Sequence, residues 1–250
     1  MMLVVGARVN STSYSQATGT ILDWSTRRES RYVCAANVHM LMESYDSPGY
    51  SQIVNSADIV TPDGMPLVWM MRMKGYPDQQ RVYGPTLMLH VLEAAARKNV
   101  PVGFYGSSPK VLQSLLARLQ ARFPNLEVDY SFSPPFQEIN QKEDAEIVEC
   151  INASSARILF VGLGCPKQEI WMSEHRGRIQ AVMLGVGAAF DFHAGVKAQA
   201  PAWIQKIGLE WLFRLVIEPR RLWKRYLYHN PRFVFLATLD LLTYLIKVKN

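Results

Sequence analysis

The sequence predicts an α/β fold: a Rossmann-like, mostly parallel sheet with helices on both faces, followed by a basic helical appendage at the C-terminus. Over residues 1–200, short apolar runs alternate with helix-length segments whose apolar positions recur every three to four residues. The short runs are apolar throughout, which is typical of parallel strands buried on both faces. From residue 201 the composition becomes basic and aromatic. We therefore expect an α/β core at 1–200 and an appendage at 201–250.

Six strands and three long helices are expected in the core. In chain order, the strands are Tyr32–Ala36, Ala57–Val60, Val102–Tyr105, Leu126–Tyr130, Arg157–Val161 and Ala181–Val186. The helices are Pro85–Lys98, Pro109–Phe123 and Glu138–Asn152, flanked by Pro, Ser and Gly. Because ligands of such folds bind beyond the carboxyl ends of the strands, we look for functional residues in the loops that follow them.

The positive charge of the chain lies in the appendage. The formal net charge is +6, and residues 206–250 hold nine Lys/Arg against three Asp/Glu, so the first 205 residues are neutral overall. The same segment contains Trp211, Trp223, Tyr226 and Phe233. A basic, aromatic arm on a neutral body binds anionic surfaces, which leaves a membrane, a nucleic acid and a phosphorylated substrate open as partners.

Hydropathy and cysteine usage predict a cytoplasmic protein. The longest apolar run, Phe233 to Ile246, covers 14 residues and contains Asp240, whereas a membrane span needs about 20. We expect an interfacial or core-packed helix there. The apolar patch at residues 1–8 is too short for a signal peptide. Three widely spaced cysteines without a CxxC pair fit a reducing compartment.

Three loops that follow expected strands carry residues suited to chemistry. In the first loop, Asp63 lies between Pro62 and Gly64, at a strand end and before a helix expected to begin near Pro66. A carboxylate held there can act as a general base. It can equally be a turn or N-cap residue, and the residues alone leave both interpretations open.

The second loop is suited to phosphate. Gly162 and Gly164 follow a strand, and Pro166 suits the first turn of a helix whose free N–H groups could receive phosphate. Lys167 and Gln168 add a cation and an amide to that turn. The loop lacks the GK[ST] ending of a Walker loop and the third glycine of a GxGxxG fingerprint. A plain tight turn is the alternative.

The third loop, residues 184–195, again has glycines directly after a strand, among them Gly187. Asp191 and His193 there could be ligands, although a lone histidine in an apolar setting is more often structural. The five histidines of the chain form no HExxH pair, and there is no Asp-x-Asp motif. We expect no metal and no cofactor, so Arg81, Lys167 and the arginines of the appendage are the cations available to neutralise phosphate.

Together these loops resemble the WecG/TagA/CpsF glycosyltransferases (family 26), which transfer a sugar from a UDP-sugar to a polyprenyl-diphosphate-linked sugar. The resemblance extends from about Ala7 to Pro231. It rests on PDGMPLVW at 62–69, RVYG at 81–84, GFYG at 103–106, VGLGCPKQE at 161–169, GVGAAFDFHAG at 185–195 and the arm at 208–226. It implies an inverting, metal-independent enzyme that docks on the cytoplasmic face of the plasma membrane, with an appendage that completes the active site.

The resemblance also implies roles for individual residues. Asp63 would be the general base, with Asn37 in the loop after the first strand. The expected substrate-binding residues are Asn37, Arg81, Gly106, Gly162, Gly164, Lys167, Gln168, Gly187 and Asp191. The expected cations of the appendage are Arg214, Arg220, Arg221 and Arg225. Because Arg220 and Arg221 are adjacent, it stays open which of these two faces the diphosphate.

The expected reaction is transfer of an N-acetylmannosamine-type sugar during synthesis of a cell-surface polymer. Ala35 stands where the family often has threonine, so a glucosyl or uronosyl donor stays an alternative. The expected partners are the UDP-sugar, the lipid-linked acceptor and an anionic membrane, contacted by aromatic residues such as Trp223, Phe233 and Phe235. A homo-oligomer is left open, and nucleic acid is not expected.

Two functions of other classes compete with this one. A nucleotide-binding oxidoreductase would need a complete glycine-rich fingerprint on the first strand, where Asn-Val-His follows instead. A non-catalytic adaptor would use the basic arm to bind membrane or nucleic acid, and its binding to RNA would depend on salt.

Overall fold

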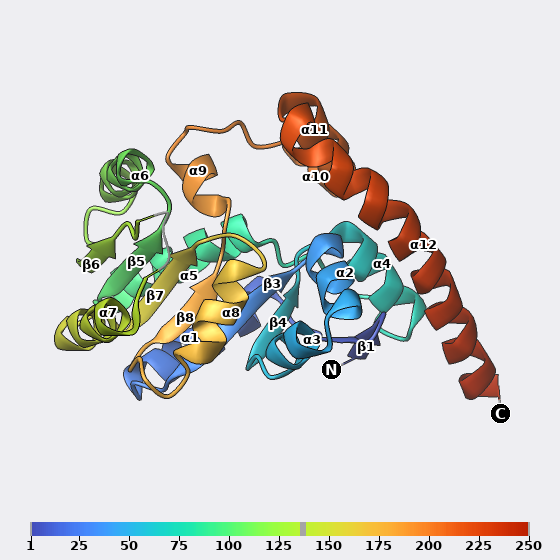
Figure 1. The fold of residues 1–250 in the computed structure, drawn as a ribbon, viewed down its shortest axis with the longest axis horizontal. Helices are drawn as coiled ribbons and strands as arrows, with labels where there is room; N and C mark the ends of the chain where they lie inside the picture. The colour runs from blue at the N-terminus through green and yellow to red at the C-terminus, as the bar shows by residue number, and fades with distance from the viewer. Residues whose placement is uncertain (1, 136–138, 250) are drawn as a thin grey trace.

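The computed structural model describes residues 2–135 and 139–249 and contains a six-stranded parallel sheet covered by helices on both faces (Figure 1). The strand order is β4-β3-β8-β7-β5-β6, and each neighbouring pair is parallel. The strands are β3 (Arg31–Ala36), β4 (Ile59–Pro62), β5 (Val102–Gly106), β6 (Val128–Phe132), β7 (Ile158–Gly162) and β8 (Val182–Gly185). A separate antiparallel hairpin consists of β1 (Met2–Val4) and β2 (Ala7–Val9).

The sheet separates two hydrophobic cores. One core receives apolar residues of α1 (Tyr14–Thr26), α5 (Gly84–Lys98), α6 (Pro109–Arg122) and α9 (Ala189–His193). The other receives those of α2 (Val38–Asp46), α3 (Pro48–Asn55), α4 (Met65–Met73), α7 (Gln141–Ala153) and α8 (Lys167–Glu174). Side chains alternate between the cores along strands such as β3 and β7, as the pleat requires.

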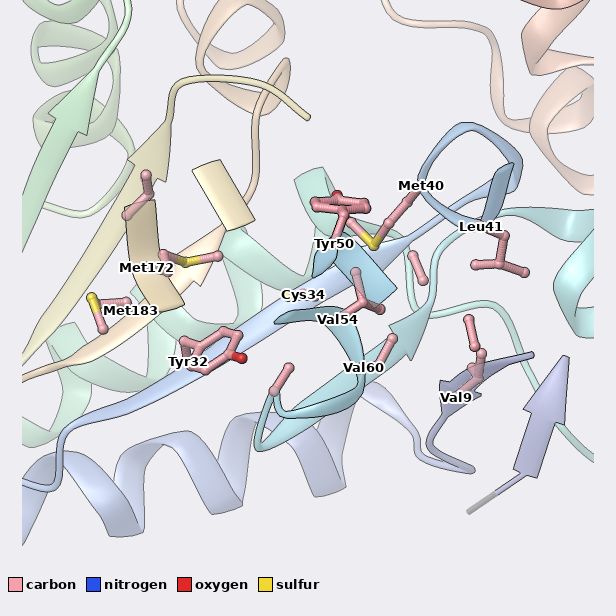
Figure 2. Close-up of a cluster of buried hydrophobic side chains, with 14 of the residues drawn as sticks. Val9, Tyr32, Cys34, Met40, Leu41, Tyr50, Val54, Val60, Met172 and Met183 are labelled. Carbon is pink, nitrogen blue, oxygen red and sulfur yellow. The ribbon is translucent and has the colours of Figure 1, made fainter. Parts of the chain in front are cut away.

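The second core shows this alternation at β3. Tyr32 and Cys34 point into it, whereas Val33 between them belongs to the opposite core. Figure 2 shows Tyr32 and Cys34 together with Tyr50 of α3 and Met172 of α8. The sheet is thus buried on both faces, as the continuous apolar runs predict.

The appendage consists of α10 (Ala202–Lys206), α11 (Glu210–Ile217) and α12 (Pro219–Lys249). In Figure 1, α12 is the long red helix that passes α2 and α4. It contributes Phe233, 4% exposed, and Ala237 to the second core. Its Asp240 forms an ion pair of 2.6 Å with the buried Lys74. None of the described helices combines the length and apolarity needed to cross a membrane.

The predicted elements are confirmed with boundary shifts of one or two residues in most cases. The strand expected at Ala57–Val60 begins at Ile59 and runs to Pro62, and the helix expected from Glu138 begins at Gln141; Glu138 itself lies outside the described residues. The sequence analysis missed the hairpin, whose strands have three residues each, and helices α1, α2 and α3. It also missed the short helix α9, which lies within the loop predicted at 184–195. The expected boundary at residue 200 stays a prediction, since the appendage shares a core with the body.

Candidate active site

Two cavities meet at the carboxyl edge of the sheet. A polar cavity of about 290 Å³ lies beyond the ends of β3, β4, β7 and β8, beneath the start of the appendage. An apolar cavity of about 470 Å³ lies between α4 and helices α11 and α12. Both are lined by Asn37, His39, Asp63, Arg214 and Arg225. A polar ligand in one cavity and an apolar ligand in the other would meet at these shared residues.

Asp63 follows β4 directly and lies at this junction. Its side chain does not cap α4, the helix that follows it, because Gly64 is the N-cap there. Instead Oδ1 accepts a 2.6 Å hydrogen bond from the backbone N–H of Gly84, the first residue of α5. Burial, together with the carboxylate of Glu210, raises the pKa of Asp63 to about 6, against the opposing effect of Arg81. A fixed carboxylate that ionises near neutral pH is suited to be a general base.

The appendage contributes a carboxylate next to Asp63. Glu210 of α11 pairs with Arg81 at 2.7 Å and accepts a 2.9 Å hydrogen bond from the hydroxyl of Tyr83. The Nε of Arg81 donates to the backbone oxygen of Asp63. Arg81 therefore faces the apolar cavity with its guanidinium already paired, rather than the polar cavity where a nucleotide-sugar ligand was expected.

Gln168 is held in the wall of the polar cavity by a buried network. Its Oε1 accepts a hydrogen bond from the N–H of Gly164 at 3.2 Å, and its Nε2 donates to Glu169 at 2.7 Å. Glu169 is fully buried and also accepts from the hydroxyl of Tyr50 at 2.9 Å, and burial raises the pKa of Glu169. A Cβ on Gly187 would lie 3.3 Å from the Gln168 side chain. The glycine thus makes room for the glutamine.

Two arginines of the appendage reach both cavities without an acidic partner. Within residues 2–135 and 139–249, no ion pair joins Arg214 or Arg225 to a carboxylate. The Nε atom of each is buried without a hydrogen-bond partner, and the Arg214 guanidinium lies 5.3 Å from the ring centre of Phe192. Unsatisfied guanidinium groups in a cavity wall are suited to anionic oxygens, phosphate in particular.

The other cationic residues of the appendage are placed differently. Arg221 lines the polar cavity, but its Nε donates to Glu218 at 2.9 Å and half of its side chain is exposed. Arg220 is exposed and lines neither cavity. Of the adjacent pair, Arg221 is therefore the one that faces the polar cavity.

Most of the remaining predicted residues line the polar cavity. They are Asn37, Gly162, Gly164, Gly187 and Asp191. Asn37 also caps α2 through its Oδ1, and Asp191 pairs with Lys197 at 2.8 Å.

Two predicted residues lie outside both cavities. Lys167 is exposed. Gly106, at φ +122°, instead allows β5 to approach β7, because a Cβ there would lie 2.7 Å from the backbone of Gly162. His193 is structural in character, since its Nε2 lies 2.9 Å from the carbonyl oxygen of Pro85.

The sequence analysis missed Tyr83, Glu210 and Lys197 as residues of the site. Tyr83 lies in the RVYG motif at 81–84 and Glu210 lies in the arm at 208–226, but a contact between residues this far apart leaves no local pattern. It also missed the apolar cavity, whose walls include Trp69, Met73 and Trp211 from helices distant in the chain.

The fold and the site define an α/β transferase in which one buried carboxylate separates a polar cavity from an apolar one. The sequence matches the glycosyl transferase WecG/TagA/CpsF family over residues 2–246, and the chain belongs to that family. It is a glycosyltransferase, as the resemblance of its motifs predicts.

Several bacterial relatives share one activity name. The chain is 32% identical over 204 residues to the N-acetylglucosaminyldiphosphoundecaprenol N-acetyl-beta-D-mannosaminyltransferase of Bacillus spizizenii, covering 81% of this chain and 77% of that protein. Proteins of the same name from Bacillus subtilis and Staphylococcus aureus are 26% and 30% identical. Each alignment covers 78% of this chain. The alignments cover 74% of the Bacillus subtilis protein and 73% of the Staphylococcus aureus protein.

Proposed function

We propose that this chain transfers N-acetylmannosamine from a UDP-sugar to a sugar carried on a polyprenyl diphosphate, with inversion and without a catalytic metal. The acceptor named in its relatives is N-acetylglucosaminyldiphosphoundecaprenol. The observation that carries the proposal is the position of Asp63, at the junction of a polar cavity with unpaired arginines and an apolar cavity. A donor that carries a diphosphate needs the polar cavity with its arginines, and an acceptor that carries a lipid needs the apolar cavity.

The polar cavity is suited to the nucleotide-sugar donor. Arg214, Arg221 and Arg225 line it and would balance the charge that develops on the departing diphosphate. The amide of Gln168 can hydrogen-bond to a sugar or a ribose, and the glycine loops let the backbone approach such a ligand closely. Because cations are supplied by the protein, the leaving group needs no divalent ion.

The apolar cavity is suited to the first isoprene units of the acceptor. Its walls include Trp69, Met73, Trp211, Phe233 and Leu241. An acceptor whose lipid lies along α12 would bring its terminal sugar to Asp63 and its diphosphate to Arg214 and Arg225, which line both cavities.

Asp63 would then remove a proton from the acceptor hydroxyl as that oxygen attacks the anomeric carbon of the donor. The new glycosidic bond forms on the face opposite the diphosphate, the bond to UDP breaks, and the proton moves to the carboxylate. The N–H of Gly84 fixes one carboxylate oxygen, which leaves the other for the proton. Positioned proton transfer of this kind contributes roughly 10²–10⁴-fold to a rate.

We further propose that the appendage rests on the cytoplasmic face of the plasma membrane. On α12, Phe235, Leu239, Leu242 and Ile246 form an exposed apolar stripe at helical spacing. Arg220, Lys224 and Lys247 are exposed on the same helix. An apolar stripe with basic residues beside it is typical of a helix that lies in an anionic interface.

Liposome binding is expected to depend on the exposed aromatic residues. A Trp223→Ala/Phe235→Ala chain should bind vesicles of anionic phospholipid markedly less than wild type in co-sedimentation, because both side chains are exposed, by 47% and 63%. The expectation that Phe233 contacts the bilayer is wrong, since it packs in the core. Phe233→Ala should instead lower stability by about 3–5 kcal/mol. Unchanged sedimentation of the double variant would contradict membrane docking through this face.

Glu210→Gln is expected to shift the acidic limb of the pH–rate profile to lower pH. In wild type, activity should rise with pH through about 6, as Asp63 loses its proton. The glutamine removes a charge that raises this pKa and leaves Arg81 without its carboxylate partner, and both changes favour ionised Asp63.

The measurement is kcat/KM across the acidic range, with Asp46→Asn as the matched control. That change removes another ion pair between body and appendage, Asp46 with Arg232, without a contact to Asp63. The control should keep the wild-type limb. Coincident limbs for Glu210→Gln and wild type would show that Glu210 does not influence the base.

The function is tested by incubating the full chain with a short-chain prenyl-diphosphate-GlcNAc and a panel of UDP-sugars, followed by mass spectrometry. The panel contains N-acetylmannosamine, its uronic acid, glucose and glucuronate. We expect one added N-acetylhexosamine with the first donor and little product with the others. Preference for a different donor would change the proposed sugar. Turnover of none of the four donors would overturn the proposal.

A further inference from the structure

We propose that His39 and Glu43 of α2, together with His229 of α12, form a zinc site that fastens the appendage to the body. One potential ligand atom from each residue lies within 4.8 Å of the other two. His39 and Glu43 are one helical turn apart, and His229 approaches from the appendage. Within the described part of the chain, no other group of three His, Cys, Asp or Glu side chains comes this close. The site lies in the wall of the cavities, since His39 lines both and His229 lines the apolar one, and zinc binding to it can be measured without sugar transfer.

The three side chains are spaced as metal ligands rather than as hydrogen-bond partners. His39 Nδ1 and Glu43 Oε1 are 3.6 Å apart, and His229 Nε2 and Glu43 Oε1 are 3.5 Å apart. Hydrogen bonds between nitrogen and oxygen are shorter, about 2.7–3.2 Å. Two ligands bound to tetrahedral zinc at about 2.0–2.1 Å are separated by about 3.3–3.4 Å. These two separations therefore suit a shared ion.

One of the two imidazoles has an unsatisfied nitrogen in the position of a ligand. The Nδ1 atom of His39, which faces Glu43, is buried without a hydrogen-bond partner, and this is costly for a polar atom. His229 faces Glu43 through Nε2. Both side chains are largely buried, with 16% of His39 and 10% of His229 exposed. Neutral imidazole is the form that ligates metals.

The ligand set selects zinc over magnesium or calcium. Two imidazoles and one carboxylate are an established set of protein ligands for zinc, whereas magnesium and calcium prefer oxygen alone. Among the surrounding charges, Arg225 and Arg232 oppose a cation, and Asp46, which is paired with Arg232, attracts one. With three protein ligands and Arg225 nearby, we expect a dissociation constant in the micromolar range.

An ion here would hold the appendage over the cavities. Helix α2 begins directly after Asn37, and His229 lies one helical turn beyond Arg225 on α12. Both Asn37 and Arg225 line the two cavities. Zinc would therefore fix the distance between a residue of the body and a cation of the appendage.

The test is calorimetric titration of Zn²⁺ into chelator-treated full-length protein at pH 7, in a Cys150→Ser background that removes an exposed thiol. We expect one zinc per chain. His39→Ala, His229→Ala and the isosteric Glu43→Gln should each weaken binding at least tenfold. His90→Ala should bind as wild type does, because it removes an exposed histidine on α5, a helix that packs on the opposite core.

Thermal unfolding provides a second readout that does not depend on activity. At a hundredfold excess over the dissociation constant, zinc should raise the midpoint by roughly 5–10 °C in wild type and His90→Ala, and not in the ligand variants. If a histidine variant fails to fold without metal, Glu43→Gln takes its place in the comparison, because the Glu43 side chain is partly exposed. Equal zinc affinity in wild type and Glu43→Gln, or no binding to wild type, would overturn the proposal.

Discussion

Asp63→Asn is expected to lower kcat by at least about a hundredfold while leaving the fold and the affinity for UDP intact. The amide can still accept the hydrogen bond from the N–H of Gly84, so the loop after β4 should keep its conformation. The amide cannot take the proton of an acceptor hydroxyl. Turnover with a soluble acceptor, UDP titration and thermal unfolding together separate loss of the base from loss of structure.

Asp78→Asn is the matched control for that variant. Asp78 is exposed and lines neither cavity, so the same loss of charge there should leave kcat near the wild-type value. If Asp63→Asn also retained near-normal kcat, Asp63 would be a residue of the turn and another group would have to act as base.

Arg214→Ala and Arg225→Ala are each expected to lower kcat/KM by roughly 10²–10³-fold, even with a water-soluble, short-chain acceptor. Their guanidinium groups line both cavities and have no carboxylate partner among the described residues. They would therefore meet the donor diphosphate and the acceptor diphosphate directly. Because the acceptor in this assay needs no membrane, a loss of rate cannot be ascribed to weaker docking.

Arg221 and Arg220 provide graded controls on α12, the helix that carries Arg225. Arg221→Ala should have a smaller effect, because Arg221 is half exposed and shares its charge with Glu218. Arg220→Ala should have none with the soluble acceptor, since its side chain lines neither cavity. Equal rates for Arg214→Ala, Arg225→Ala and Arg220→Ala would show that the arginines of the appendage form a basic surface and take no part in catalysis.

The sheet and the position of the site could be predicted from the sequence because both follow from local patterns. Continuous apolar runs such as Ile158–Gly162 identify buried parallel strands without knowledge of their neighbours. The rule that ligands bind beyond strand ends then directs attention to Asn37, Asp63 and Gly187, which do line one cavity.

The partners of these residues could not be predicted, because they depend on how distant segments pack. Nothing near Arg81 in the sequence indicates that Glu210 pairs with it, more than a hundred residues away. The same holds for Phe233, which packs in the core although Val234 and Phe235 directly after it are exposed and apolar. A run of apolar residues on one helix does not reveal which of them pack in the core.

The configuration of the bond formed in the product tests the central claim most directly. If Asp63 activates the acceptor for a single displacement at the junction of the two cavities, nuclear magnetic resonance of the product must show the anomeric configuration opposite to that of the UDP-sugar donor. The relatives are named as beta-D-mannosaminyltransferases, and we predict a β-linked product from an α-linked donor. Retention of the donor configuration would contradict a single displacement and remove Asp63 from the role of general base.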